Sequence, residues 1–169
     1  MTKTVYFAHG KESGPWGTKI RTLAEIAKKR GFDVISPDYS TISSPDERVQ
    51  LLIEQVSKSA RSEQLVLAGS SMGSYVSTVA SEVIQPDGLF LLAPAFYLPG
   101  YSNQNPTPHA RALLTIHGWQ DEVVPVEKAI HFSQQHKATL HLIDGDHRLT
   151  EQLPQLCQLF DQFLADLAT

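Results

Sequence analysis

Short apolar runs alternate along this chain with longer segments in which hydrophobic residues recur every three or four positions. The runs, typical of buried strands, are residues 4–8, 32–36, 64–68, 89–93, 112–116 and 139–143. The segments with helical spacing are residues 20–30, 49–56, 72–83, 125–136 and 150–167. Strands that alternate with helices predict right-handed crossovers and helices on both faces of one sheet. The expected fold class is α/β, a three-layer α/β/α sandwich with a six-stranded, mostly parallel sheet.

Local signals define where several of these elements begin and end. Ser44 followed by Pro45 is a helix start signal, and Gly31 after a basic last turn is a helix stop signal. The run at 89–93 contains no polar residue, so this strand must be covered on both faces. Residues 94–110 contain four prolines and show no clear period, which predicts a loop that flanks the functional site.

Length and charge narrow the class of protein. A chain of 169 residues with 41% hydrophobic content can bury one good core, and we expect a single domain over residues 1–169. A net charge of −4 provides no basic surplus for nucleic acid or anionic lipid. Apolar runs such as 88–95 are far shorter than the roughly 20 residues of a membrane-spanning helix. We therefore expect neither a nucleic-acid nor a membrane partner.

The N-terminal residues and the number of cysteines predict the cellular location, and the cysteine and histidine positions predict whether a metal is bound. Strand-like sequence begins at about Lys3, where a secretory signal would otherwise lie. Cys157 is the only cysteine, which excludes an internal disulfide and a thiolate metal cage. Both observations predict a cytoplasmic protein. The seven histidines lack the i, i+4 pairing with a glutamate that marks a helical zinc site, so we expect no metal and no cofactor.

A G-x-S-x-G sequence, residues 69–73, lies between a predicted strand and a predicted helix. In this context the motif forms a sharp strand-to-helix turn that exposes a strained serine, and glycines on either side prevent a clash. Of the two adjacent serines, only Ser71 has glycine two positions away on both sides, whereas Ser70 has Ala68 and Met72. Ser71 is therefore the candidate nucleophile.

Two main-chain N–H groups are candidates for stabilising a developing oxyanion. The N–H of Met72 opens the helix that follows the candidate nucleophile, where the helix dipole is positive. The second donor is expected after the first strand, where the sequence His9-Gly10-Lys11 offers the Lys11 N–H. His9 itself, like His117, is interpreted as a residue that shapes its loop by hydrogen bonding.

A serine hydroxyl needs a histidine base, and that base needs a carboxylate to orient it. His147 follows the sixth strand, whereas His131 and His136 fall in a helix and His141 in a strand. Ligands meet such sheets at the carboxyl ends of the strands, so His147 is the candidate base. Asp121, after the fifth strand, is the candidate acid. Other carboxylates remain as rivals: Glu122, Asp144 and Asp146.

These segments together resemble the α/β-hydrolase superfamily: HG after the first strand, GSSMG, HGWQDEVVP and DGDH. The resemblance runs from about Val5 to His147 and is greatest to compact bacterial esterase-like members without a cap domain. It implies a Ser71–His147–Asp121 triad and a serine hydrolase that forms an acyl-enzyme, most simply on small carboxylic esters. The loop after the first strand lacks the glycine run of many esterases. Candidate substrate-binding residues are Gly10, Trp16, Phe96 and Tyr97.

Other functions stay open on the sequence. A strand followed by several glycines suggests a nucleotide site, but neither a phosphate-loop Gly-Lys-Ser/Thr step nor a G-x-G-x-x-G fingerprint occurs. An interaction protein that keeps the fold without the activity is the principal alternative. Within acyl transfer, thioester and amide substrates, and an alcohol as acceptor in place of water, are further alternatives. The oligomeric state is not predicted.

Overall fold

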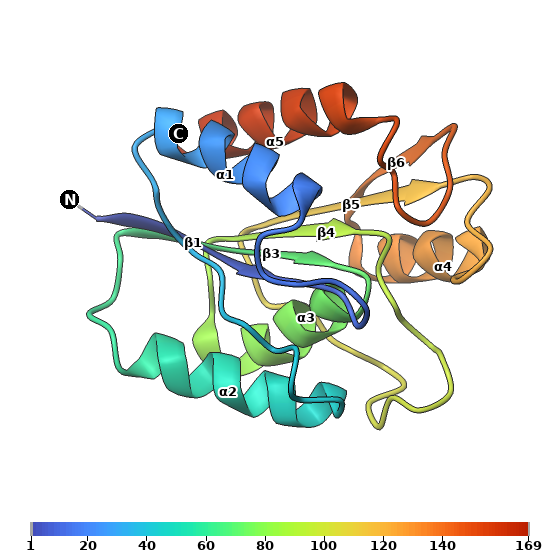
Figure 1. Cartoon of the computed structure of the whole chain (residues 1–169), viewed down its shortest axis with the longest axis horizontal. Helices are drawn as coiled ribbons and strands as arrows, with labels where there is room; N and C mark the ends of the chain where they lie inside the picture. Colours follow the sequence, from blue (N-terminus) through green and yellow to red (C-terminus); the bar gives the residue numbers. More distant parts are fainter. Residues whose placement is uncertain (1, 169) are drawn as a thin grey trace.

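Six parallel strands form one sheet in the order β2-β1-β3-β4-β5-β6 in the computed structural model, which describes residues 2–168 (Figure 1). The strands are β1 (Lys3–Ala8), β2 (Asp33–Ile35), β3 (Gln64–Ser70), β4 (Gly88–Leu92), β5 (Ala112–Gly118) and β6 (Thr139–Ile143). The helices are α1 (Thr18–Lys29), α2 (Pro45–Ser57), α3 (Met72–Ile84), α4 (Val126–His136) and α5 (Leu153–Leu167). The α/β class and the six-stranded parallel sheet are thus confirmed.

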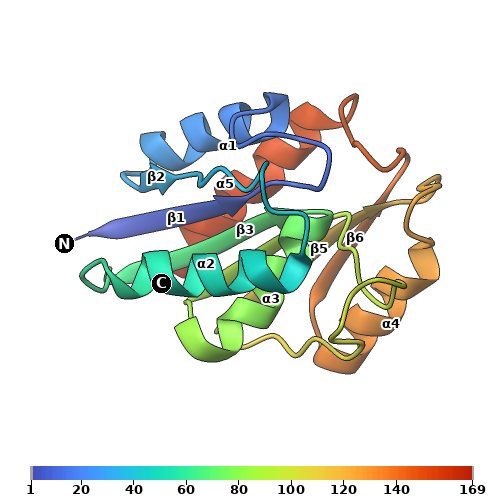
Figure 2. The ribbon, with the colours of Figure 1, turned by 60° about the horizontal axis from the view of Figure 1, so that its bottom comes forward.

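The helices cover the sheet on both faces. Figure 1 shows α1 and α5 on one face and α2, α3 and α4 on the other, and Figure 2 shows the ribbon turned so that the second group comes forward. Between the sheet and α5, the ring of Phe160 packs 6.0 Å from Phe7 and 4.7 Å from Phe90. On the opposite face, Phe96 stacks on Phe132 of α4 at 4.2 Å. Every residue of β4 is buried, as its wholly apolar sequence predicts.

Two helix starts differ from the sequence prediction. Helix α4 begins at Val126 with Pro125 as its N-cap residue, one position later than expected. Helix α5 begins at Leu153 and not near residue 150. Leu149 has a φ of 55°, a left-handed conformation that no α-helix can include, so the helix has to start after it. The start of α2 follows its signal, because the Ser44 side chain accepts a hydrogen bond from the Glu47 N–H.

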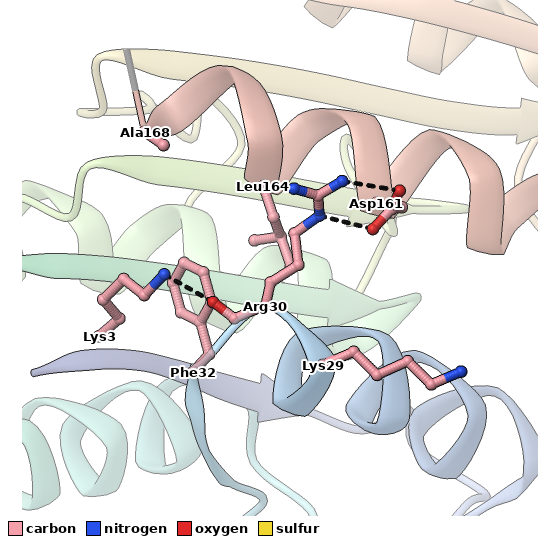
Figure 3. A pocket seen from close by; sticks show the side chains of 7 residues that line it. All are labelled: Lys3, Lys29, Arg30, Phe32, Asp161, Leu164 and Ala168. Atoms are coloured by element: carbon pink, nitrogen blue, oxygen red, sulfur yellow. Dashed lines mark hydrogen bonds and ion pairs between the residues drawn. The ribbon is translucent and has the colours of Figure 1, made fainter.

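A surface cavity of about 310 Å³ lies where β1 begins and where α1 and α5 end (Figure 3). The Arg30 guanidinium forms a two-pronged ion pair with Asp161, which ties α1 to α5. The Lys3 ammonium donates to the Arg30 carbonyl, while Lys29 points away from this group. The cavity therefore lies beside the ion pair that joins α1 to α5.

The helices of residues 2–168 include none that is both long enough and apolar enough to cross a lipid bilayer.

Candidate active site

Ser71 lies alone between the last residue of β3 and the first residue of α3. Its backbone has φ 56° and ψ −115°, a combination that is strained for a residue with a side chain. A Cβ atom on Gly69 would approach the Gly73 carbonyl oxygen to 2.3 Å, and one on Gly73 would approach the Ala8 carbonyl oxygen to 1.8 Å. Both flanking glycines are therefore required by this turn, as the G-x-S-x-G pattern predicts.

Ser71, His147 and Asp121 form a continuous hydrogen-bonded series. The Ser71 Oγ lies 2.9 Å from His147 Nε2, and His147 Nδ1 lies 2.7 Å from Asp121 Oδ2. An ionised carboxylate can only accept, so Nδ1 carries the ring proton of the neutral histidine and Nε2 is free to accept from the serine hydroxyl. The three residues follow β3, β6 and β5, so the carboxyl ends of three parallel strands bring them together.

The Asp121 carboxylate is fully buried and saturated with donors. Its Oδ1 accepts from the N–H groups of Val123 at 2.8 Å and Val124 at 2.7 Å. Its Oδ2 lies 3.2 Å from His117 Nε2 in addition to its contact with His147. Burial on its own raises the pKa of Asp121, but the hydrogen bonds from His117, His147 and Val124 outweigh it and hold this pKa well below its ordinary value. The carboxylate therefore stays ionised at neutral pH.

The rival acids have other contacts. Asp146 accepts from the N–H groups of Arg148 and Leu149, which shapes the loop that carries His147. Glu122 and Asp144 are exposed. A further contact joins the acid and base loops, because Gln120 Oε1 accepts from the Gly145 N–H at 2.8 Å. The structure thus pairs His147 with Asp121 and uses the neighbouring polar residues to position the loops.

Both candidate oxyanion donors are unpaired in the described part of the chain, and each belongs to a segment that adjoins the serine. Neither the Met72 N–H nor the Lys11 N–H donates to another group within residues 2–168. Gly10 packs closely on the serine, since a Cβ on it would be 3.6 Å from the Ser71 Cβ. Its own N–H is occupied by the Ser13 hydroxyl at 2.9 Å. The loop after β1 therefore presents Lys11, and not Gly10, as the available donor.

The candidate substrate-binding aromatic residues lie in different surroundings. Trp16 is 46% exposed on the loop before α1 and can contact a ligand. Phe96 is 0% exposed, because its ring stacks on Phe132 in the core between the sheet and α4. Tyr97 is partly buried and packs edge-on against His131 at 5.2 Å. The expectation that Phe96 contacts substrate therefore has no support in its geometry.

Lys19 is a neighbour of the site that the sequence did not indicate. Its ammonium donates to the Ser70 hydroxyl at 3.1 Å, one residue before the candidate nucleophile. The pKa of Lys19 is lowered to about 8, mainly by burial; Arg148 adds to the lowering, while Asp146 and Asp121 partly offset it. A lysine on the polar side of a helix carries no pattern that distinguishes it from a solvated one, so only the structure could reveal this contact.

No group of three or more His, Cys, Asp and Glu side chains is arranged to hold a metal ion in the part of the chain that the structure describes.

The parallel sheet, the serine at the strand-to-helix turn and the histidine after the last strand define an α/β hydrolase. The family model described as "Phospholipase/Carboxylesterase" matches residues 30–167, and the chain belongs to this family. A search of curated proteins found no significant match. The chain is therefore a hydrolase of the α/β superfamily, of the carboxylesterase-like kind.

Solved structures agree with this assignment over nearly the whole chain. One similar structure is a protein from Xanthomonas campestris pv. campestris that is described as a "putative hydrolase of the alpha/beta superfamily". It is 29% identical with a TM-score of 0.89, and the match covers 98% of this chain and 99% of that one. Est1E from Butyrivibrio proteoclasticus is 17% identical with a TM-score of 0.81, covering 99% and 88%. A second Xanthomonas campestris protein, described as a serine hydrolase without lid, is 19% identical with a TM-score of 0.75, covering 96% and 81%. The latter two likenesses concern the fold.

Proposed function

We propose that this protein is a serine hydrolase that cleaves small carboxylic esters through an acyl-enzyme. The observation that carries the proposal is the pair of contacts of 2.9 Å and 2.7 Å that link Ser71, His147 and Asp121 at a strained turn. A nucleophile, a base within hydrogen-bonding reach and a carboxylate that orients the base are the parts that acyl transfer requires. The family match to phospholipases and carboxylesterases supports an ester as the bond that is cleaved.

The reaction follows from the positions of these groups. His147 Nε2 takes the hydroxyl proton as Ser71 Oγ attacks the ester carbonyl, and Asp121 stabilises the imidazolium that forms. The negative oxygen of the tetrahedral intermediate accepts from the N–H groups of Met72 and Lys11. His147 then gives its proton to the departing alcohol, which leaves an acyl-enzyme. Water attacks this ester with His147 again as base, and the carboxylic acid and free serine are released.

A small substrate is proposed because little of the chain can enclose a large one. The connection between β4 and β5, residues 93–111, is long but contains no helix or strand in the structure. Est1E, which shares the fold, has also been solved with ferulic acid bound, so a protein of this fold binds a small aromatic acid. A panel of p-nitrophenyl esters of increasing acyl length tests this point. Activity should fall as the acyl chain lengthens, and flat activity across lengths would contradict a small pocket.

The nucleophile is tested with a fluorophosphonate probe, which labels activated serines covalently. We expect labelling of the wild type and of Ser70→Ala, the matched control one residue away, and no labelling of Ser71→Ala. An unlabelled wild type would favour the alternative of an interaction protein that keeps the fold without the activity. Labelling that persists in Ser71→Ala would assign the chemistry to another residue.

Cooperation between serine and histidine is tested by a double mutant. Ser71→Ala and His147→Ala should each lower turnover of a small ester by several orders of magnitude, and the double variant should be little worse than either. Additive losses would argue against a shared mechanism. A cytoplasmic location and the lack of nucleic-acid and membrane partners remain predictions from the sequence.

A further inference from the structure

Arg48, in the first turn of α2, is a buried cation without a counterion. The residue is 1% exposed, and no carboxylate in residues 2–168 lies within ion-pairing distance of its guanidinium. Its Nε donates to the Ile42 carbonyl at 2.7 Å. Its Cζ lies over the Tyr39 ring, 5.8 Å from the ring centroid. A charge removed from water in this way destabilises a fold unless dipoles compensate it, so the use of arginine here calls for an explanation.

The guanidinium points at the loop after β1. Arg48 Nη1 lies 3.2 Å from the Gly10 carbonyl oxygen and 3.5 Å from that of His9. The Gly10 oxygen also lies 2.8 Å from His9 Nδ1. The Tyr39 N–H donates to His9 Nε2 at 2.9 Å, which leaves the proton of the neutral ring on Nδ1, facing Gly10. Two buried side chains therefore donate to one carbonyl.

The same peptide group contains the Lys11 N–H. In a planar trans peptide the C=O of one residue and the N–H of the next point in opposite directions. Holding the Gly10 oxygen toward Arg48 and His9 therefore turns the Lys11 N–H away from them. Gly10 packs against Ser71, where a Cβ on the glycine would be 3.6 Å from the Ser71 Cβ. A rotated peptide would instead present a carbonyl oxygen, which repels an oxyanion.

We propose that Arg48 and His9 are positioning residues, which hold the Gly10 carbonyl so that the Lys11 N–H is fixed as an oxyanion donor. The loop needs such support because it lacks a glycine run and the Gly10 N–H is held only by the Ser13 hydroxyl. The cation behind the carbonyl favours one direction of the peptide dipole and disfavours the reverse. This inference rests on the proposed hydrolase function for its kinetic consequence, but its structural part stands independently.

The kinetic test uses Arg48→Met, which keeps most of the side-chain volume but removes the charge and all donors. Arg61→Met is the matched control, because Arg61 also donates to two carbonyls, those of Ile84 and Gln85, at the far end of α3. Loss of one oxyanion donor lowers kcat by about 10²–10³-fold. We expect Arg48→Met to lower kcat about 100-fold with KM changed less than about threefold, and Arg61→Met to retain wild-type kcat.

Two further measurements separate positioning from general damage. A boronic acid, which forms a tetrahedral adduct with the serine, should bind Arg48→Met more weakly in proportion to the loss of kcat. Arg48→Lys keeps the charge and can reach one carbonyl, so it should recover part of the activity. Wild-type kcat in Arg48→Met, or equal losses in Arg48→Met and Arg61→Met, would overturn the proposal.

Crystal structures of wild type and Arg48→Met provide a readout that needs no activity. A Gly10–Lys11 peptide that rotates or becomes disordered in the variant supports the proposal, and an unchanged peptide overturns it. If the wild type hydrolyses no ester, the proposed function fails while this comparison still decides the positioning role. If Arg48→Met does not fold, His9→Leu is used in the same way, with His9→Asn as its conservative partner that restores a donor near the Nδ1 position.

Discussion

Four groups fix the Asp121 carboxylate: the N–H groups of Val123 and Val124, and the rings of His117 and His147. The two main-chain donors occupy Oδ1 and leave Oδ2 to the rings. This division determines the direction in which the aspartate holds His147, and so the tautomer that faces Ser71. This set of donors distinguishes Asp121 from the rival acids Glu122, Asp144 and Asp146.

Asp121→Asn is the sharpest test of this arrangement. The amide can present an N–H to His147 Nδ1 and so favour the wrong tautomer, in which Nε2 carries a proton and cannot accept from Ser71. We expect kcat for a small ester to fall by about 10⁴-fold with little change in KM, as for tautomer loss in serine proteases. Glu122→Gln is the control and should keep wild-type activity. Comparable losses in both variants would contradict the assignment.

The lowered pKa of Asp121 also makes the stability of the fold depend on pH. The unfolded chain binds a proton at this residue below about pH 4, whereas the folded chain keeps it ionised to lower pH. The stabilisation is therefore complete above about pH 4 and is lost as the pH falls toward the folded pKa. Urea unfolding at several pH values should show that the free energy of unfolding of the wild type exceeds that of Asp121→Asn most at pH 5 and above. A difference that is constant from pH 6 to pH 2 would refute this linkage.

Residues with a fixed spacing or a fixed place after a strand could be predicted, and residues that act through distant contacts could not. Ser71 is predicted by its flanking glycines, and His147 and Asp121 by their places after strands. Arg48 and Lys19 fall at ordinary polar positions of helices, so nothing in the pattern distinguishes them from solvated side chains. Phe96 follows a strand end, which suggests the cleft, but the chain turns it inward onto Phe132.

At the scale of elements, the contact between β1 and α3 requires glycine at position 73. The first turn of α3 crosses the end of β1 so closely that a Cβ on Gly73 would be 1.8 Å from the Ala8 carbonyl oxygen. This crossing sets the distance between the loop that carries Lys11 and the turn that carries Ser71. The two halves of the expected oxyanion hole are thus spaced by main-chain packing.

Gly73→Ala should therefore be severely destabilising, because two backbones have to separate and not merely a side chain. We expect a loss of more than about 4 kcal/mol in the free energy of unfolding, or failure to accumulate folded protein. Gly14→Ala is the matched control, since a Cβ there meets nothing within 4 Å. Thermal unfolding of the two variants checks this. A Gly73→Ala protein as stable as the control would contradict the backbone contact between β1 and α3.

Boundaries of elements were predicted well where a local signal exists and less well where tertiary contacts decide. Ser44 and Pro45 start α2 as expected. The start of α5 depends on the left-handed Leu149, whose side chain is fully buried and whose N–H is held by Asp146. That conformation follows from packing and from a loop contact, neither of which shows in the hydrophobic period. Strand order is likewise set by packing of the whole sheet.

At the scale of the whole molecule, α1 and α5 cover one face of the sheet, and α5 connects distant parts of the chain there. Phe160 is fully buried and its ring contacts Phe7 of β1 and Phe90 of β4, so it joins the last helix to strands near both the start and the middle of the chain. The loop with His147 leads directly into this helix. Packing of α5 therefore also supports the position of His147.

Phe160→Ala should lower the free energy of unfolding by about 3–5 kcal/mol, a large share of the 5–15 kcal/mol typical of a domain. The cause is the cavity left between α5 and the sheet. Val83→Ala is the control: this residue is 64% exposed, and the change should stay within about 0.5 kcal/mol. Denaturant melts of both variants measure the difference. Equal midpoints would show that α5 contributes little to the cooperative unit.

The two ends of the described chain lie together at the edge where the strands begin, since Lys3 and Ala168 border the same cavity (Figure 3). Ser71 and His147 lie across the sheet, at the edge where the strands finish. A tether attached to either terminus would therefore leave the reactive edge facing the medium. Immobilisation on a bead or fusion to a carrier through these ends should retain access for dissolved compounds.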